Sequence, residues 1–179
     1  MLNALITSKT RIKLMLKFFL NSSSTGYLRG LETEFGESTN AIRIELNRFE
    51  EAGLLTSITE NNKKIFQANK KHPLFPDIHS LMRKYTGIDK IVERVIEHLG
   101  EPEELYLIGD LAKGIESPDL NLIIVGENID IDYLQSLVDK AQQAVSRSIK
   151  YAVFTPDDFA RHLPHLNQEK LLRVWQNTD

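Results

Sequence analysis

Residues 38–69 read STNAIRIELNRFEEAGLLTSITENNKKIFQAN, and this stretch decides the fold of the N-terminal half. A helix is predicted from Ser38, a preferred N-cap residue, to about Ala52. Its apolar residues recur at spacings of four and three and form one stripe that suits burial: Ile42, Leu46 and Phe49. Gly53 is expected to end the helix, because glycine readily adopts the positive φ of the position after a helix.

A β-hairpin is predicted after this helix. Thr56–Glu60 and Lys64–Gln67 carry the alternating pattern and the β-branched residues of strands. Asn61-Asn62 between them suits a tight turn, because asparagine tolerates a left-handed backbone. Upstream, the apolar spacing predicts a helix over Ser8–Leu20, and a short helix is expected over Tyr27–Phe35, after the polar loop of residues 21–26 and before Gly36. This order of three helices and a hairpin is that of a winged helix-turn-helix, so double-stranded DNA is the first candidate partner.

Several polar residues of residues 38–69 lie outside the apolar stripe. An arginine can bind guanine through two hydrogen bonds, an asparagine can bind adenine in the same way, and a threonine can bond to either. The predicted DNA-binding residues are Thr39, Asn40, Arg43, Asn47, Lys63 and Lys64, the two lysines being assigned to phosphates. Two alternatives stay open: the module binds a protein partner, or Lys63 and Lys64 are simply a solvated turn.

The N-terminal region also resembles a known family. Its segments ELNRFEEAGLL, residues 45–55, and NKKHPLF, residues 69–75, are similar to those of arsenic-repressor-like winged-helix proteins. The resemblance covers roughly residues 1–86. It implies a winged helix-turn-helix DNA-binding domain, which is expected over residues 1–71.

The charge is distributed unevenly along the chain. Residues 1–71 carry 11 lysines and arginines against 7 acidic residues, a net +4, whereas residues 72–179 carry 11 against 18, a net −7. A charge of +4 is small for a protein that binds a polyanion, so a homodimer that presents two such surfaces is expected.

The absence of cysteine excludes disulfides, thiolate metal sites and a cysteine nucleophile. No run of 18 apolar residues is present, and a cytoplasmic protein without membrane contact is expected.

The second half alternates between helix and strand patterns. Residues 72–100 are expected to form a linker and helices for packing or dimerisation, over Asp77–Tyr85 and Ile88–Leu99. Strands are then predicted over Glu104–Ile108, Asn121–Val125 and Lys150–Phe154, and helices over Asp132–Ser146 and Gln168–Gln176. The whole is expected to be an α+β protein whose C-terminal domain, residues 101–179, is a small mixed sheet covered by helices.

A second resemblance covers about Ile88–Phe159. The runs LIGDLAKG, residues 107–114, and SPDLNLIIV, residues 117–125, are similar to the motif of minimal nucleotidyltransferases of the DNA polymerase beta-like superfamily. The resemblance implies a vestigial nucleotide site at Gly109, Asp110, Lys113, Gly114, Ser117, Asp119 and Asn121.

The departures from that motif decide the expected activity. The family carries two carboxylates one residue apart on a strand, whereas this chain has Asp119 and then Asn121. Asp110 replaces a serine, and the strand Lys150–Phe154 carries no third acid. Because Mg²⁺ sites rely on carboxylates, the chain is expected not to be an enzyme and to use no catalytic residue, metal or cofactor. The expected function is a DNA-binding transcriptional regulator whose inactive second domain serves sensing, dimerisation, or binding of a nucleotide or a protein. The alternative is an active nucleotidyltransferase whose winged helix recruits substrate.

Overall fold

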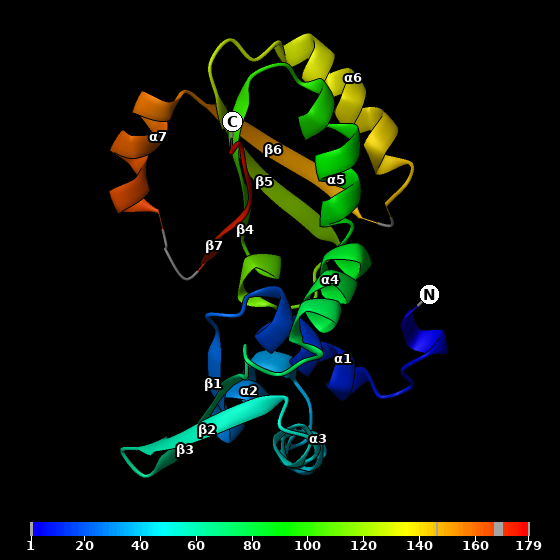
Figure 1. Cartoon of the computed structure of the whole chain (residues 1–179), viewed down its shortest axis with the longest axis vertical. Helices are drawn as coiled ribbons and strands as arrows, with labels where there is room; N and C mark the ends of the chain where they lie inside the picture. Colours follow the sequence, from blue (N-terminus) through cyan, green and yellow to red (C-terminus); the bar gives the residue numbers. More distant parts are fainter. Residues whose placement is uncertain (1, 146, 167–169, 179) are drawn as a thin grey trace. The chain divides into compact units, whose positions relative to one another are not determined.

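The computed structural model describes residues 2–145, 147–166 and 170–178. It divides into two compact units, residues 1–82 with 113–116, and residues 83–112 with 117–179 (Figure 1). Each unit combines helices with one sheet, which confirms the predicted α+β class. Within the described residues, no helix is both long enough and apolar enough to cross a bilayer. The predicted domain boundaries at residues 71 and 100 stay predictions.

The first unit holds short and long helices around one small sheet. Its elements in chain order are η1 (Leu2–Ala4), α1 (Lys9–Met15), the π-helical η2 (Leu16–Leu20), β1 (Thr25–Tyr27), α2 (Leu28–Phe35), α3 (Thr39–Glu51), β2 (Leu55–Glu60) and β3 (Lys63–Ala68). α4 (Phe75–Thr86) begins in this unit. Its core contains side chains from η2, α2, α3 and β2, among them Phe18, Phe19, Leu31, Ile42, Leu46 and Leu55.

The residues predicted to begin and end α3 are found at its two ends. Ser38 Oγ accepts a hydrogen bond from the backbone N–H of Ala41, which caps the start of the helix. At the other end Gly53 has φ of +71°, and the N–H of Leu54 donates to the carbonyl oxygen of Phe49. The predicted helix and its end at Gly53 are therefore confirmed.

The hairpin of β2 and β3 is also confirmed. Asn61 and Asn62 connect the strands with φ of +47° and +61°, as the tight turn requires. A third strand, β1, was not predicted: it pairs antiparallel with β3 and sets Tyr27 opposite Ile65. The sheet order is therefore β1-β3-β2.

The second unit is a four-stranded mixed sheet between helices. Its elements are α5 (Ile88–Arg94), η3 (Ile96–His98), β4 (Pro102–Ile108), η4 (Leu111–Lys113, shared with the first unit), β5 (Asp119–Gly126), α6 (Ile131–Gln142), β6 (Ser148–Phe154), α7 (Pro156–His162), η5 (Leu163–His165) and β7 (Leu171–Gln176). The order is β6-β5-β4-β7, with β5 and β6 parallel and the other pairs antiparallel. α5 and α6 cover one face, and α7 covers the other (Figure 1).

Three predicted helices of this half differ from the structure. Ile88–Leu99 is α-helical only to Arg94, and the predicted Asp132–Ser146 helix ends at Gln142, with Ser146 outside the described residues. The predicted helix Gln168–Gln176 is wrong: Leu171–Gln176 is strand β7, and Gln168 lies outside the described residues.

A β-bulge explains the error at β7. Leu105 is paired with Trp175 and Tyr106 with Arg173, so that Val174 is an extra residue in the strand. The bulge breaks the alternation of period two, and the apolar residues fall at a spacing that also fits a helix. The Arg83 guanidinium donates to the carbonyl oxygen of Val174, which keeps the bulged residue hydrogen-bonded.

Candidate nucleic-acid interface

A groove of about 630 Å³ runs along the first unit beside α3. Its walls come from α3, from the β2–β3 turn with the start of β3, and from the segment that joins β1 to α2. The charged and amide side chains of its wall are Arg29, Arg43, Lys63, Lys64, Asn47, Asn61 and Asn62. Leu28, Leu46, Tyr27 and Phe66 supply its apolar surface. No acidic residue is among the described residues that line it, so the groove suits an anionic ligand.

Local folding places the basic groups on both walls. Arg43 and Asn47 lie one helical turn apart on α3, and both are exposed because the opposite face of the helix is buried. Lys63 and Lys64 begin β3 directly after the asparagine turn. The helix and the hairpin therefore present their cations toward one space.

The structure brings four of the predicted residues together, namely Arg43, Asn47, Lys63 and Lys64. Thr39 and Asn40 do not line the groove. Thr39 is the half-buried first residue of α3, and Asn40 is exposed on the same helix. DNA binding by the six residues, these two and the four in the groove, stays a prediction.

The cations of the groove differ in how strongly they are already paired. Lys64 Nζ lies 2.6 Å from Oε2 of Glu50, and Ser57 Oγ donates a hydrogen bond to Oε1 of the same carboxylate. The hydrogen bonds from Lys64 and then Ser57 lower the pKa of Glu50 from its ordinary value, despite partial burial. Lys63 Nζ lies 4.5 Å from the centre of the Tyr27 ring, and no described carboxylate forms an ion pair with Lys63 or Arg43. Among the described residues of the groove wall, Arg29, Arg43 and Lys63 are therefore the cations that no described carboxylate pairs with.

Arg29 and Tyr27 are groove residues that the sequence reasoning missed. They reach the groove because β1 pairs with β3 and brings the start of α2 beside the hairpin. The available signal was Thr25-Gly26-Tyr27, a β-branched and an aromatic residue between a polar loop and a helix. Three residues are too few for periodicity to predict a strand.

An ionic network fixes α3 to α1. Glu45 is 7% exposed, and Arg11 reaches it through Nε at 2.8 Å and Nη2 at 3.3 Å. Ser8 and Arg48 donate to the same carboxylate at 3.1 and 3.2 Å. Burial alone would raise the pKa of Glu45, but the hydrogen bonds from Arg11 and Ser8 and the nearby positive charges outweigh it and lower that pKa. The helix that carries Arg43 is thus anchored by charge as well as by apolar burial.

Two residues of the second predicted site, Asp119 and Asn121, lie at the start of β5. Asp119 and Asn121 alternate onto one face of that strand, together with the buried Ile123 and Val125. A carboxylate oxygen of Asp119 pairs with Lys150 Nζ at 3.0 Å, and its backbone N–H donates to Ser117 Oγ at 3.1 Å. The carboxylate is therefore paired with a lysine of the neighbouring strand β6.

The glycines of this motif have structural roles. Gly109 follows β4 with φ of +78°, and a Cβ atom there would lie 3.4 Å from Nδ2 of Asn121. Gly114 has φ of +77°, and a Cβ atom there would overlap the backbone of Leu16 and Lys17, 2.6 Å from the carbonyl oxygen of Leu16. Lys113 and Gly114 belong to the first unit, whereas Gly109, Asp110, Ser117, Asp119 and Asn121 belong to the second.

The donor set fits Mg²⁺ poorly. On β5 the site offers one carboxylate, Asp119, which is held by a lysine, and one neutral amide, Asn121, whereas the hard cation takes carboxylates. Among residues 2–145, 147–166 and 170–178, no group of three histidine, aspartate or glutamate side chains is placed to hold a metal.

Comparisons with known proteins give weak likenesses. No family model matches the chain, and no curated protein matches it. A Sulfolobus solfataricus protein provisionally assigned as a nucleotidyltransferase is 18% identical, covers 56% of this chain and 86% of its own, and has a TM-score of 0.38. A mutant of the MntA–HpeT toxin–antitoxin is 14% identical, with 51% and 73% covered and a TM-score of 0.38. Sso10a-2, a DNA-binding protein from Sulfolobus solfataricus, is 16% identical, with 48% and 87% covered and a TM-score of 0.34.

These values assign neither a family nor an activity to the chain. One expectation is nevertheless corrected: the prediction that the chain is not an enzyme is contradicted, because a protein described as a nucleotidyltransferase is among the similar structures. None of these three similar structures is described as an arsenic repressor or a winged helix, so the arsenic-repressor resemblance stays a prediction.

Proposed function

We propose that the first unit is a winged helix that binds double-stranded DNA and that the protein regulates transcription. The observation that carries the proposal is the single groove that Arg29, Arg43, Lys63 and Lys64 share beside an exposed helix face. Affinity for duplex DNA comes largely from cations that neutralise phosphates, and a helix of this size fits the major groove. The groove supplies the cations and α3 supplies the helix.

In the proposed complex, α3 enters the major groove and the hairpin follows the backbone. Asn40, Arg43 and Asn47 reach base edges, while Thr39, Lys63 and Lys64 contact phosphates. A homodimer would place two such helices on half-sites one turn of DNA apart. Pairing also doubles the modest positive charge of the N-terminal region.

The test is a selection from a randomised duplex library with the full-length protein, followed by titrations on the enriched sequence. Arg43→Ala should cost roughly 1 to 3 kcal/mol of binding free energy if Arg43 reads a guanine, and should relax selection at that position. Lys9→Ala is the control, because Lys9 is exposed at the start of α1 and does not line the groove. Failure to enrich any sequence, together with binding that no groove variant changes, would refute the proposal.

A second candidate function is nucleotidyl transfer by the second unit, with the winged helix recruiting the substrate. The observation that favours it is the grouping of Asp119, Asn121 and Lys150 on one face of neighbouring strands. Lys150 would supply the positive charge that a nucleotide phosphate needs. A transfer assay with labelled nucleoside triphosphates tests it with and without Mg²⁺, for the parent and for Asn121→Asp. Label that stays free in both proteins would argue against this candidate.

A further inference from the structure

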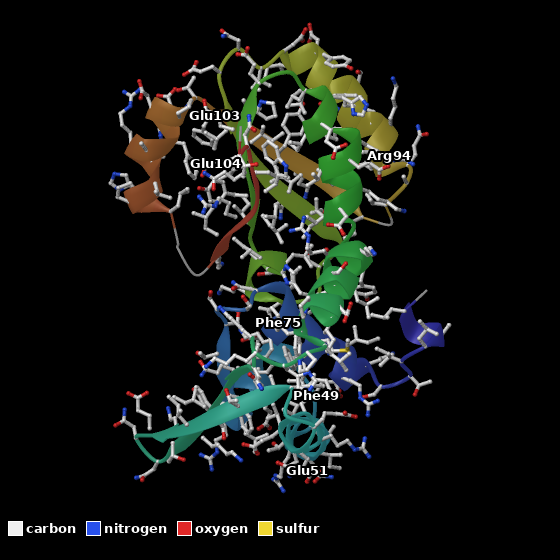
Figure 2. The ribbon with its side chains drawn as sticks, in the orientation of Figure 1. Phe49, Glu51, Phe75, Arg94, Glu103 and Glu104 are labelled. Atoms are coloured by element: carbon white, nitrogen blue, oxygen red, sulfur yellow. The ribbon has the colours of Figure 1, made fainter. Side chains whose placement is uncertain are left out.

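The most outward stripe of α3 shares Asn47 with the groove wall but continues onto a face with different chemistry. Asn40, Ile44, Asn47 and Glu51 follow each other at spacings of four, three and four, opposite the buried face of the helix. Figure 2 shows Phe49 and Glu51 on opposite sides of α3, which fixes the direction of this stripe. Arg43 lies beside it, on the side of the hairpin.

Ile44 is the apolar member of this stripe and is 43% exposed. An exposed isoleucine alone needs no explanation. Here, however, it stands between two asparagines on the face that a major-groove complex turns toward the bases. Asparagine binds adenine through two hydrogen bonds, and an apolar side chain packs against the C5-methyl group of thymine. Adenine and thymine are partners in one base pair, so the three side chains favour the same composition.

We propose that Ile44 packs against a thymine methyl group and that, with Asn40 and Asn47, it directs the protein to A·T base pairs of duplex DNA. This inference rests on the proposed DNA-binding function and names its sequence class. It also excludes double-stranded RNA as the ligand, because the major groove of A-form RNA is too deep and narrow for a helix and uracil carries no C5-methyl group.

The experiment uses the full-length protein and two randomised duplex libraries, one made with thymine and one with uracil in its place. The parent should bind the thymine pool more tightly, by about fourfold for each contacted thymine, as expected from the burial of one methyl group. Ile44→Ala should bind both pools equally. Asn47→Ala should keep the thymine preference and lose enrichment of adenine at one position.

Ile131→Ala is the matched control. Ile131 is an isoleucine of similar exposure, 50%, at the start of α6 in the second unit, so its replacement should leave the preference between the pools unchanged. Circular dichroism of each variant checks that it is folded.

The outcomes separate the two proposals. Equal binding of both pools by the parent would overturn the role of Ile44 while DNA binding stands, and a thymine preference that survives Ile44→Ala would overturn it as well. Absence of binding to either pool would overturn the DNA-binding function itself. A thymine preference lost only in Ile44→Ala would support the inference.

Discussion

Replacing Glu50 by glutamine should tighten DNA binding and make it more sensitive to salt. In the protein, Lys64 Nζ lies 2.6 Å from the Glu50 carboxylate, so the charge of Lys64 is largely offset before any nucleic acid arrives. Glutamine keeps the size of the side chain and an oxygen that can accept the hydrogen bond of Ser57. The change therefore frees one cation of the groove with little disturbance of the fold.

The size of the effect follows from counterion release. One more neutralised phosphate adds about 0.9 to the slope of log affinity against log salt on duplex DNA. Between about 50 and 200 mM salt this slope corresponds to an extra change in affinity of roughly 3.5-fold. Glu50→Gln should thus bind DNA more tightly than the parent. The ratio of the variant's affinity to the parent's affinity should be about 3.5 times larger at the low salt concentration than at the high one.

Fluorescence anisotropy with a labelled duplex over a salt series measures both quantities. Glu37→Gln is the control, because Glu37 forms an ion pair of similar length with Lys13, 2.7 Å, and does not line the groove. If Glu50→Gln binds no more tightly than the parent, or its slope is not steeper, then Lys64 does not act on phosphate and the assignment of the hairpin fails.

Three further predictions concern the groove, acid stability and one glycine. Lys63→Ala should make the salt slope shallower by about 0.9, and more so than Lys64→Ala, whose charge Glu50 already offsets; equal slopes in anisotropy titrations would contradict this. The lowered pKa of Glu45 means that its contribution to stability is present above its ordinary value of 4.5 and is lost as the pH falls through the lowered folded value. In urea titrations Glu45→Gln should therefore start less stable at neutral pH and lose less unfolding free energy on acidification than the parent. Gly114→Ala should destabilise the protein by about 1 to 3 kcal/mol through overlap with neighbouring backbone, in addition to its left-handed φ. Its control is Gly36→Ala, which has a left-handed φ but open space around the added methyl group; equal melting temperatures of the two variants would contradict the predicted overlap.

The sequence predicts the elements whose signals are local. Ser38, Gly53 and Asn61-Asn62 each act within a few residues of themselves, and the helix and hairpin that they bound are found where expected. The mixed sheet was likewise predicted from its apolar strands. Such signals depend on backbone preferences and need no knowledge of distant partners.

The features that the sequence did not predict depend on pairing between distant residues. β1 exists because Tyr27 meets Ile65, and the bulge at Val174 is visible only once β4 lies beside β7. The offset of Lys64 by Glu50 likewise joins residues 14 positions apart. Four of the predicted DNA-binding residues line one groove, but only these contacts show which of its cations is already paired with a carboxylate.

The short segment Lys113–Glu116 has a practical consequence for dissecting the protein. It belongs to the N-terminal unit, although about 30 residues of the other unit precede it in the chain. A fragment that stops at residue 82 would lack this piece and leave the backbone of Leu16 and Lys17 uncovered where Gly114 packs. Truncation would remove part of the unit under study, so point substitutions in the intact polypeptide are the sounder route to assigning its roles.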